Sequence, residues 1–128
     1  MKNKTLSKKD LKRLWDAMGK LLDTLASTDV DEYSSLIKNF VGGQEMLPVL
    51  HYLQKVDKNN LPPNATLLVY GCGCFILSKA AGQILQENKK LDKDDQAYLK
   101  DYIEYNVRKC RIDISLFHYL EHGEWLWD

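Results

Sequence analysis

The cysteines offer the most reactive side chains in this sequence. Cys72 and Cys74 flank Gly73, and Cys110 lies farther along the chain. If the segment around Gly73 is a helix, the two neighbouring thiols point about 200° apart and cannot chelate one ion. An odd number of cysteines in a chain of ordinary composition indicates free thiols and a reducing compartment. We therefore interpret all three as small apolar core residues and expect a cytoplasmic protein.

Two arginines and two histidines share the polar side of the last predicted helix. His118 and His122 are one helical turn apart, which is a spacing that two metal ligands can use. Arg108 and Arg111 lie on the same side and are suited to binding a phosphate. Neither pattern is specific, because histidines near a helix C-terminus are commonly solvated and are favoured there by the helix dipole. We expect solvated side chains here, with no metal and no cofactor.

Motifs for nucleophilic or phosphate chemistry are lacking in the sequence. It contains no Gly-rich nucleophile turn, no phosphate-binding loop and no zincin motif. The paired carboxylates Asp94 and Asp95 stand at a predicted helix start, where interaction with the helix dipole accounts for them. The sequence therefore favours a non-enzymatic protein. A metal-dependent or phosphate-handling enzyme at His118 and His122 remains the weakest of three hypotheses.

Composition argues for one globular domain covering residues 1–128. The chain has 28% charged and 45% hydrophobic residues and a formal net charge of zero, which argues against a polybasic nucleic-acid binder. The charge is unevenly spread, because seven Lys and Arg residues but only two acids fall within residues 1–20. Nucleic-acid binding is therefore the second hypothesis. It would use Lys4, Lys8, Lys9, Lys12 and Arg13, aided by Arg108 and Arg111.

The fold should be organised around residues 65–78, a run of fourteen positions without a charge. This run is shorter than the roughly 18 to 20 apolar residues of a membrane span, so we expect none. We predict a helix that continues through residues 79–87 and is buried on most sides. One line of it consists mainly of small residues that allow close helix packing: Leu67, Gly71, Cys74, Ser78, Ala81 and Leu85. The alternative is a short buried strand at residues 66–76.

The remaining segments read as amphipathic helices. Ser7 caps a first helix with an apolar stripe from Leu11 to Leu25, and a second helix from Val30 ends at Gly42 and Gly43. A third starts near Pro48 and precedes a loop at residues 57–64, and a long one spans residues 93 to about 122. The sequence predicts an all-α, single-domain bundle of five or six helices around the Gly-rich central one.

The last helix carries more apolar surface than one neighbour needs. A stripe of tyrosines, with Ile112 and Leu116, runs beside its regular apolar stripe. Either the helix crosses the middle of the bundle or this stripe receives a partner, since Tyr is favoured at wet interfaces. The two tryptophans near the end of the chain either dock on the protein's own core or anchor another molecule.

These features favour a small soluble helical protein without catalytic activity. Its partner would be another protein or a second copy, and an interaction, regulatory or toxin-neutralising accessory role suits its size. The predicted protein-binding residues are Tyr98, Tyr102, Tyr105, Tyr119, Trp125 and Trp127.

Overall fold

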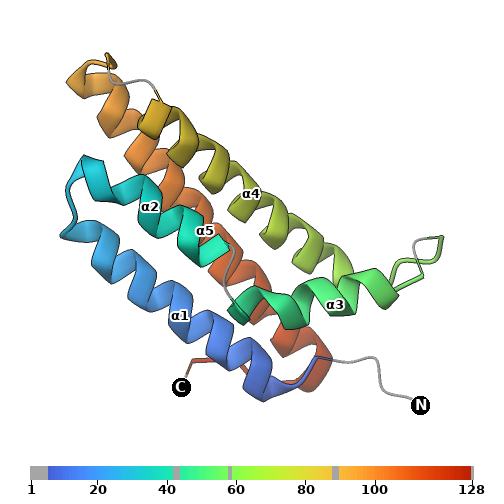
Figure 1. Ribbon diagram of the computed structural model, residues 1–128. Coiled ribbons are helices and arrows are strands. Elements are labelled where there is room, and N and C mark those ends of the chain that lie inside the picture. The colour runs from blue at the N-terminus through green and yellow to red at the C-terminus, as the bar shows by residue number, and fades with distance from the viewer. Residues whose placement is uncertain (1–5, 42–43, 58, 88–89, 128) are drawn as a thin grey trace.

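The computed structural model describes residues 6–41, 44–57, 59–87 and 90–127, and all the regular structure in these ranges is helical. The helices are α1 (Lys8–Ala26), α2 (Val30–Val41), the short 3-10 helix η1 (Gln44–Met46), α3 (Leu47–Lys55), α4 (Ala65–Glu87) and α5 (Lys93–His122) (Figure 1). The all-α prediction is confirmed. The strand alternative for residues 66–76 is wrong, because they lie within α4. Gly42 and Gly43, predicted to end α2, lie outside the described residues.

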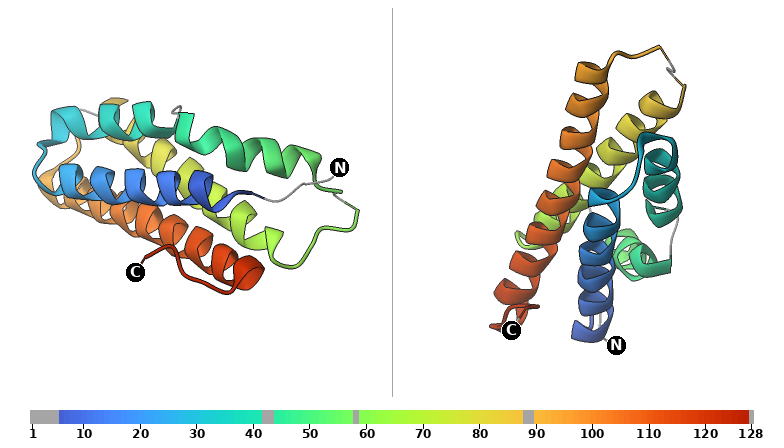
Figure 2. Two further views of the ribbon diagram at one scale, coloured as in Figure 1. Left: turned by 90° about the horizontal axis from the view of Figure 1, so that it is seen from below. Right: turned by 90° about the vertical axis from the view of Figure 1, so that its left-hand side faces the viewer.

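Four helices form the bundle and α3 lies across one end of it. The two longest, α4 and α5, run antiparallel and make the most extensive contact in the described fold. Two further helices pack against this pair, with α1 along α5 and α2 on α4 (Figure 2). After α5 the chain turns back and runs beside α1. The long α5 therefore has α4 on one side and α1 with the C-terminal segment on the other.

Helix ends are set by local hydrogen bonds that the sequence predicts. Ser7 Oγ accepts a hydrogen bond from the Asp10 amide at 3.1 Å, and the Asp92 carboxylate accepts one from the Asp95 amide at 2.8 Å. Gly123 ends α5 with a φ of 78°, and its amide donates to the carbonyl of Tyr119 at 2.7 Å. This left-handed residue both ends α5 and reverses the chain.

Small residues let α4 approach α5 closely. Gly71 is buried, and a Cβ built on it would lie 3.4 Å from Cys110 Sγ. Ser78 is fully buried, with its hydroxyl oxygen 3.4 Å from the carbonyl oxygen of Ile103 and 3.0 Å from that of Cys74. The predicted line of small residues is therefore the side of α4 that contacts α5.

The opposite side of α4 is exposed. The buried residues of α4 lie on the side that faces α5 and α2. There Phe75 of α4 stacks on Phe40 of α2, with ring centroids 4.9 Å apart. Large apolar side chains such as Tyr70 and Ile76 face solvent instead. The prediction that this helix is enclosed on most sides is not confirmed. Because α4 is apolar all round, its sequence periodicity does not tell which side lies in the core.

Candidate protein-binding site

The predicted tyrosine stripe is divided between two surfaces. Tyr98 and Tyr105 are 68% and 63% exposed, whereas Tyr102 is half-buried and packs against the core. Tyr119, near the end of α5, stacks on Trp125 with ring centroids 4.2 Å apart. The six predicted residues therefore do not form one site. Tyr98 and Tyr105 belong to a surface shared with α4, and Tyr119 belongs to a cluster built by the C-terminal segment.

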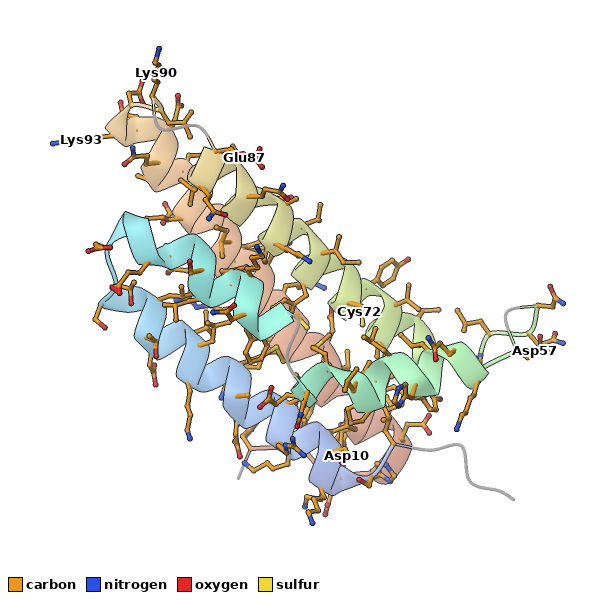
Figure 3. All side chains as sticks on the ribbon, in the orientation of Figure 1. Asp10, Asp57, Cys72, Glu87, Lys90 and Lys93 are labelled. Atoms are coloured by element: carbon orange, nitrogen blue, oxygen red, sulfur yellow. The ribbon has the colours of Figure 1, made fainter. Side chains whose placement is uncertain are left out.

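The first surface is a continuous apolar face over α4 and α5, which we call the outer face. Its members share large apolar side chains that are substantially exposed, and they are Tyr70, Ile76, Leu77 and Ile84 of α4 with Tyr98 and Tyr105 of α5. Figure 3 places Cys72 on α4, with Glu87 at its end and Lys93 where α5 begins. The outer face therefore extends from Tyr70 to Ile84 on α4 and over the first part of α5, from Tyr98 to Tyr105.

Two grooves hollow the outer face. One, of about 490 Å³, is lined by Tyr70, Gly73, Cys74, Ile76, Leu77, Tyr105 and Lys109. At Gly73 a Cβ would meet no other atom within 4 Å, so the glycine leaves space open. The second groove, of about 380 Å³, is lined by Leu77, Ala80, Ala81, Ile84, Tyr98, Leu99 and Tyr102. Because Leu77 borders both, the grooves adjoin.

Sequence reasoning missed the contribution of α4, although a pattern indicates it. Tyr70, Leu77 and Ile84 are spaced seven residues apart, and so are Tyr98 and Tyr105 on α5. A seven-residue spacing keeps side chains on nearly the same side of a helix and is typical of helices that pack along another helix. Tyr70, Leu77 and Ile84 therefore form an exposed apolar ridge on α4, and Tyr98 and Tyr105 form one on α5. Residues of both ridges line the two grooves.

The second surface is an aromatic clasp, formed by Trp15, Tyr119, Trp125 and Trp127. Trp127 lies 6.0 Å from the Trp15 ring and 4.7 Å from the Trp125 ring, measured between centroids. Beside these partly exposed rings, Leu126 is only 1% exposed and is the most buried residue of the C-terminal segment. The segment thus docks on its own domain. Its most buried residue is a leucine between two tryptophans, which no sequence pattern indicates.

The clasp buries His118, so the prediction of a solvated side chain is wrong. His118 is fully buried, and its Nδ1 lies 2.7 Å from the carbonyl oxygen of Glu124. Since a carbonyl only accepts, Nδ1 carries the proton and donates it. Nε2 of His118 and Oγ of Ser115 have no hydrogen-bond partner among the described residues. Helix periodicity could not foresee this burial, because residues 123–127 fold back over the polar side of α5.

The structure separates the predicted anion or metal face into two parts. His122 is exposed, and its ring centroid lies 4.6 Å from that of His118. Arg111 instead reaches α1, where its Nε donates to the carbonyl oxygen of Trp15 at 3.0 Å. Arg108 forms an ion pair within α5, with its Nη2 3.7 Å from Oε1 of Glu104. The two arginines and the two histidines therefore have separate partners and do not form one binding face.

The cysteines have the environment of buried thiols. Burial raises the pKa of Cys72 to about 11, and it raises the pKa of Cys74 and Cys110 as well. Such thiols stay protonated at neutral pH and are poor nucleophiles. Within the described part of the chain, no group of three or more His, Cys, Asp or Glu residues is placed to hold a metal ion.

The basic side of α1 is partly neutralised. Lys8 forms an ion pair with Glu124 of the C-terminal segment, and Lys12 pairs with Asp16 at 3.3 Å. Lys4 lies outside the described residues. Two of the five predicted nucleic-acid contacts in this region are thus already engaged by carboxylates, which lowers the local positive potential.

By length and composition α4 also meets the requirements of a membrane span. It has 23 residues, and its most apolar 18-residue window has a mean hydropathy of 1.4. The core helix of a globular bundle can satisfy the same criteria, and α4 buries Phe75 and its small-residue side within the fold. The absence of a membrane span therefore stays a prediction.

Comparisons with protein-family models, with curated proteins and with solved structures found no match to this chain.

Proposed function

We propose that the protein binds another protein through the outer face, with a helix of the partner lying along the groove between α4 and α5. The observation that carries this proposal is the pair of apolar ridges at seven-residue spacing, one on each of two adjacent antiparallel helices. A partner helix packed between the ridges would complete the arrangement that long helices adopt in bundles and coiled coils.

The size of the outer face supports this proposal. With about 150–250 Å² of surface on an aromatic side chain and roughly half of each member exposed, the face offers on the order of 600 Å². This area is at the upper end of the range of about 300–600 Å² for the largest apolar patch on a typical monomer. A standard interface buries about 800 Å² on each partner, so the face with its polar rim approaches that size.

Grooves and a polar rim give the face the anatomy of an interface. The two grooves accept apolar side chains on either side of Leu77. At the edge of one, Lys109 pairs with the buried carboxylate of Asp113 at 3.0 Å. Fixed charges at the rim and apolar pockets at the centre are the usual distribution in specific protein interfaces.

A regulatory or toxin-neutralising accessory role in the cytoplasm is part of the proposal. Its support is the presence of free thiols whose pKa values are raised by burial, which is typical of proteins in a reducing compartment. Nucleic-acid binding has less support, because Lys8 and Lys12 are paired with carboxylates. A lipid surface is the competing occupant of the outer face.

Photo-crosslinking in cells tests the proposal. A photo-crosslinking phenylalanine analogue in place of Tyr105 should give one discrete protein adduct, because its ring projects from the outer face. The same analogue in place of Arg13, exposed on α1, is the matched control and should give none. An adduct of twice the chain's mass would identify the partner as a second copy.

Two outcomes would overturn the proposal. One is the absence of a protein adduct at position 105, or adducts of equal yield at positions 105 and 13. The other is a combined result: the purified protein floats with lipid vesicles, Leu77→Glu abolishes this flotation, and cells give no protein adduct at position 105. That second result would assign the outer face to a lipid surface.

A further inference from the structure

A separate pocket lies between α1, α5 and the C-terminal segment. It has a volume of about 240 Å³ and is lined by Trp15, Leu22, Arg108, Arg111, Ile112 and Trp127. Figure 2 shows α1 running beside α5, on the side of α5 away from α4. We call it the α1–α5 pocket. It shares no lining residue with either groove of the outer face.

The guanidinium of Arg111 is held rigidly in this pocket. Its carbon lies 3.6 Å from the centroid of the Trp15 ring, and its Nε donates to the Trp15 carbonyl oxygen. Gly19 leaves room for it, since a Cβ at that position would lie 2.5 Å from Nη2 of Arg111. A glycine inside a helix costs about 1 kcal/mol relative to alanine, and the close approach of Arg111 explains its presence.

This fixed cation lacks a partner for its outer nitrogens. Nη1 and Nη2 of Arg111 make no hydrogen bond or ion pair with any described residue. Asp16 and Asp23 on α1 act on it only through their longer-range field, and Asp16 is paired with Lys12. Burial lowers the pKa of Arg111, which indicates that the guanidinium is partly dehydrated.

We propose that the α1–α5 pocket binds a small organic carboxylate with an apolar, preferably aromatic, body. The two free Nη groups form the planar fork that matches a carboxylate, and stacking on Trp15 fixes the direction of this fork. The apolar body would lie against Trp127 and Ile112. The pocket is smaller than the roughly 300–1,000 Å³ of sites for drug-sized ligands, so one ring or a short chain is the appropriate size.

Inorganic phosphate fits the pocket less well than a carboxylate. Arg108 also lines the pocket but is paired with Glu104, the other lining residues beside Arg111 are apolar, and a dianion would lose more hydration on entering. Asp16 and Asp23 also add negative potential nearby. The competing explanation is that Arg111 only fastens α5 to α1. In that case the pocket has no preference for a carboxylate over a neutral molecule of the same shape.

Tryptophan fluorescence provides the readout, because Trp15 and Trp127 line the pocket and Trp125 stacks on Trp127. The purified full chain is titrated at constant ionic strength with benzoate, with its neutral analogue benzamide, and with inorganic phosphate. We expect a saturable change with benzoate, with a Kd on the order of 1 mM for so small a ligand. Benzamide and phosphate should bind at least about tenfold more weakly.

Three variants make the test specific. Arg111→Gln should weaken benzoate binding at least about tenfold. Arg13→Gln removes an exposed arginine of α1 outside the pocket and should leave the titration unchanged. Ile112→Asp places a negative charge at the pocket while Arg111 remains, and should weaken benzoate as strongly. It tests the site even if Arg111→Gln fails to fold, because Ile112 is exposed.

The proposal is overturned if benzoate gives no saturable change or binds no better than benzamide. It is equally overturned if benzoate affinity survives both Arg111→Gln and Ile112→Asp. None of these results bears on the outer face, which is tested by crosslinking at position 105.

Discussion

The aromatic clasp and the outer face are two surfaces built on the same helix with similar residues, yet only one of them is covered. In the clasp, Tyr119 stacks on Trp125, and Leu126 of the returning segment is buried beside the rings. On the outer face, Tyr98 and Tyr105 make no ring contact or hydrogen bond with any described residue. Both tyrosines lie in the same seven-residue register as Tyr119.

This difference shows that spacing places aromatic residues on a surface but does not decide what covers them. Gly123 reverses the chain, and the ion pair between Lys8 and Glu124 connects the returning segment to α1. At the outer face no comparable described segment returns over α4 and α5. We therefore propose the outer face, and not the clasp, as the surface that binds another molecule.

The largest contrast is expected between neighbouring residues on the two sides of α4. Phe75 is 1% exposed and stacks on Phe40, whereas Ile76 is 63% exposed. Phe75→Ala should lower the free energy of unfolding by about 3–5 kcal/mol, because it leaves a cavity in the core. Ile76→Ala should change it by less than about 0.5 kcal/mol. Urea denaturation measures both, and a loss above 2 kcal/mol for Ile76→Ala would show that the outer face is covered.

Removing the anchor of the clasp should have the next largest effect. Leu126→Ala should lower the free energy of unfolding by about 2–3 kcal/mol, since Leu126 is fully buried. It should also release the stacked tryptophans, with loss of near-ultraviolet circular dichroism. Leu120→Ala is the control, because Leu120 is about half exposed on α5. Equal effects of the two variants would contradict a docked C-terminal segment.

Alkaline pH tests whether the thiol of Cys72 on α4 is shielded from water. Cys72 has a pKa raised to about 11 by burial, above the value of roughly 8.5 of an unfolded thiol. The folded state therefore keeps its full advantage below pH 8.5 and loses it as the pH rises toward 11. The expected slope is about 1.4 kcal/mol per pH unit for this thiol. Cys72→Ala should remove that share of the slope, as measured by denaturation at each pH.

A small gain in stability is expected when the buried Ser115 of α5 is replaced by alanine. Ser115 is fully buried, and its hydroxyl has no partner among the described residues. Ser115→Ala removes this unpaired group and raises helix propensity, so it should stabilise the fold by about 0.5–1 kcal/mol. Thermal unfolding with calorimetry gives the value. A loss of stability would indicate that the hydroxyl is paired in solution.

Much of the fold follows from local patterns in the sequence. Asp92 and Gly123 mark the two ends of α5 because capping involves only nearby backbone groups. Gly71 and Ser78 predict the α4–α5 contact because small residues at helical spacing permit close packing. In both cases the residues that carry the signal lie within or next to one helix, so the sequence of that segment is enough for the prediction.

Features that depend on distant segments could not be predicted in this way. The sequence predicts a solvated His118, whereas its side chain is buried and hydrogen-bonded to the carbonyl oxygen of Glu124 in the returning segment. The helix over residues 65–78 is predicted to be buried on most sides, whereas Leu77 within it lies between two surface grooves. Arg111 was placed with the histidines, whereas it stacks on Trp15 of α1. Each of these positions is set by which segments cover α4 and α5, and helical periodicity carries no information on that choice.

The proposed binding function of the outer face is tested most directly by two matched substitutions. Leu77 of the outer face and Leu50 of α3 are 47% and 40% exposed, so Glu at either position should disturb the fold equally little. Affinity for the partner crosslinked at position 105 is measured by calorimetry, or by sedimentation if that partner is a second copy. We predict that Leu77→Glu weakens binding at least about 100-fold and Leu50→Glu less than about threefold. Equal affinities of the two variants would contradict the assignment.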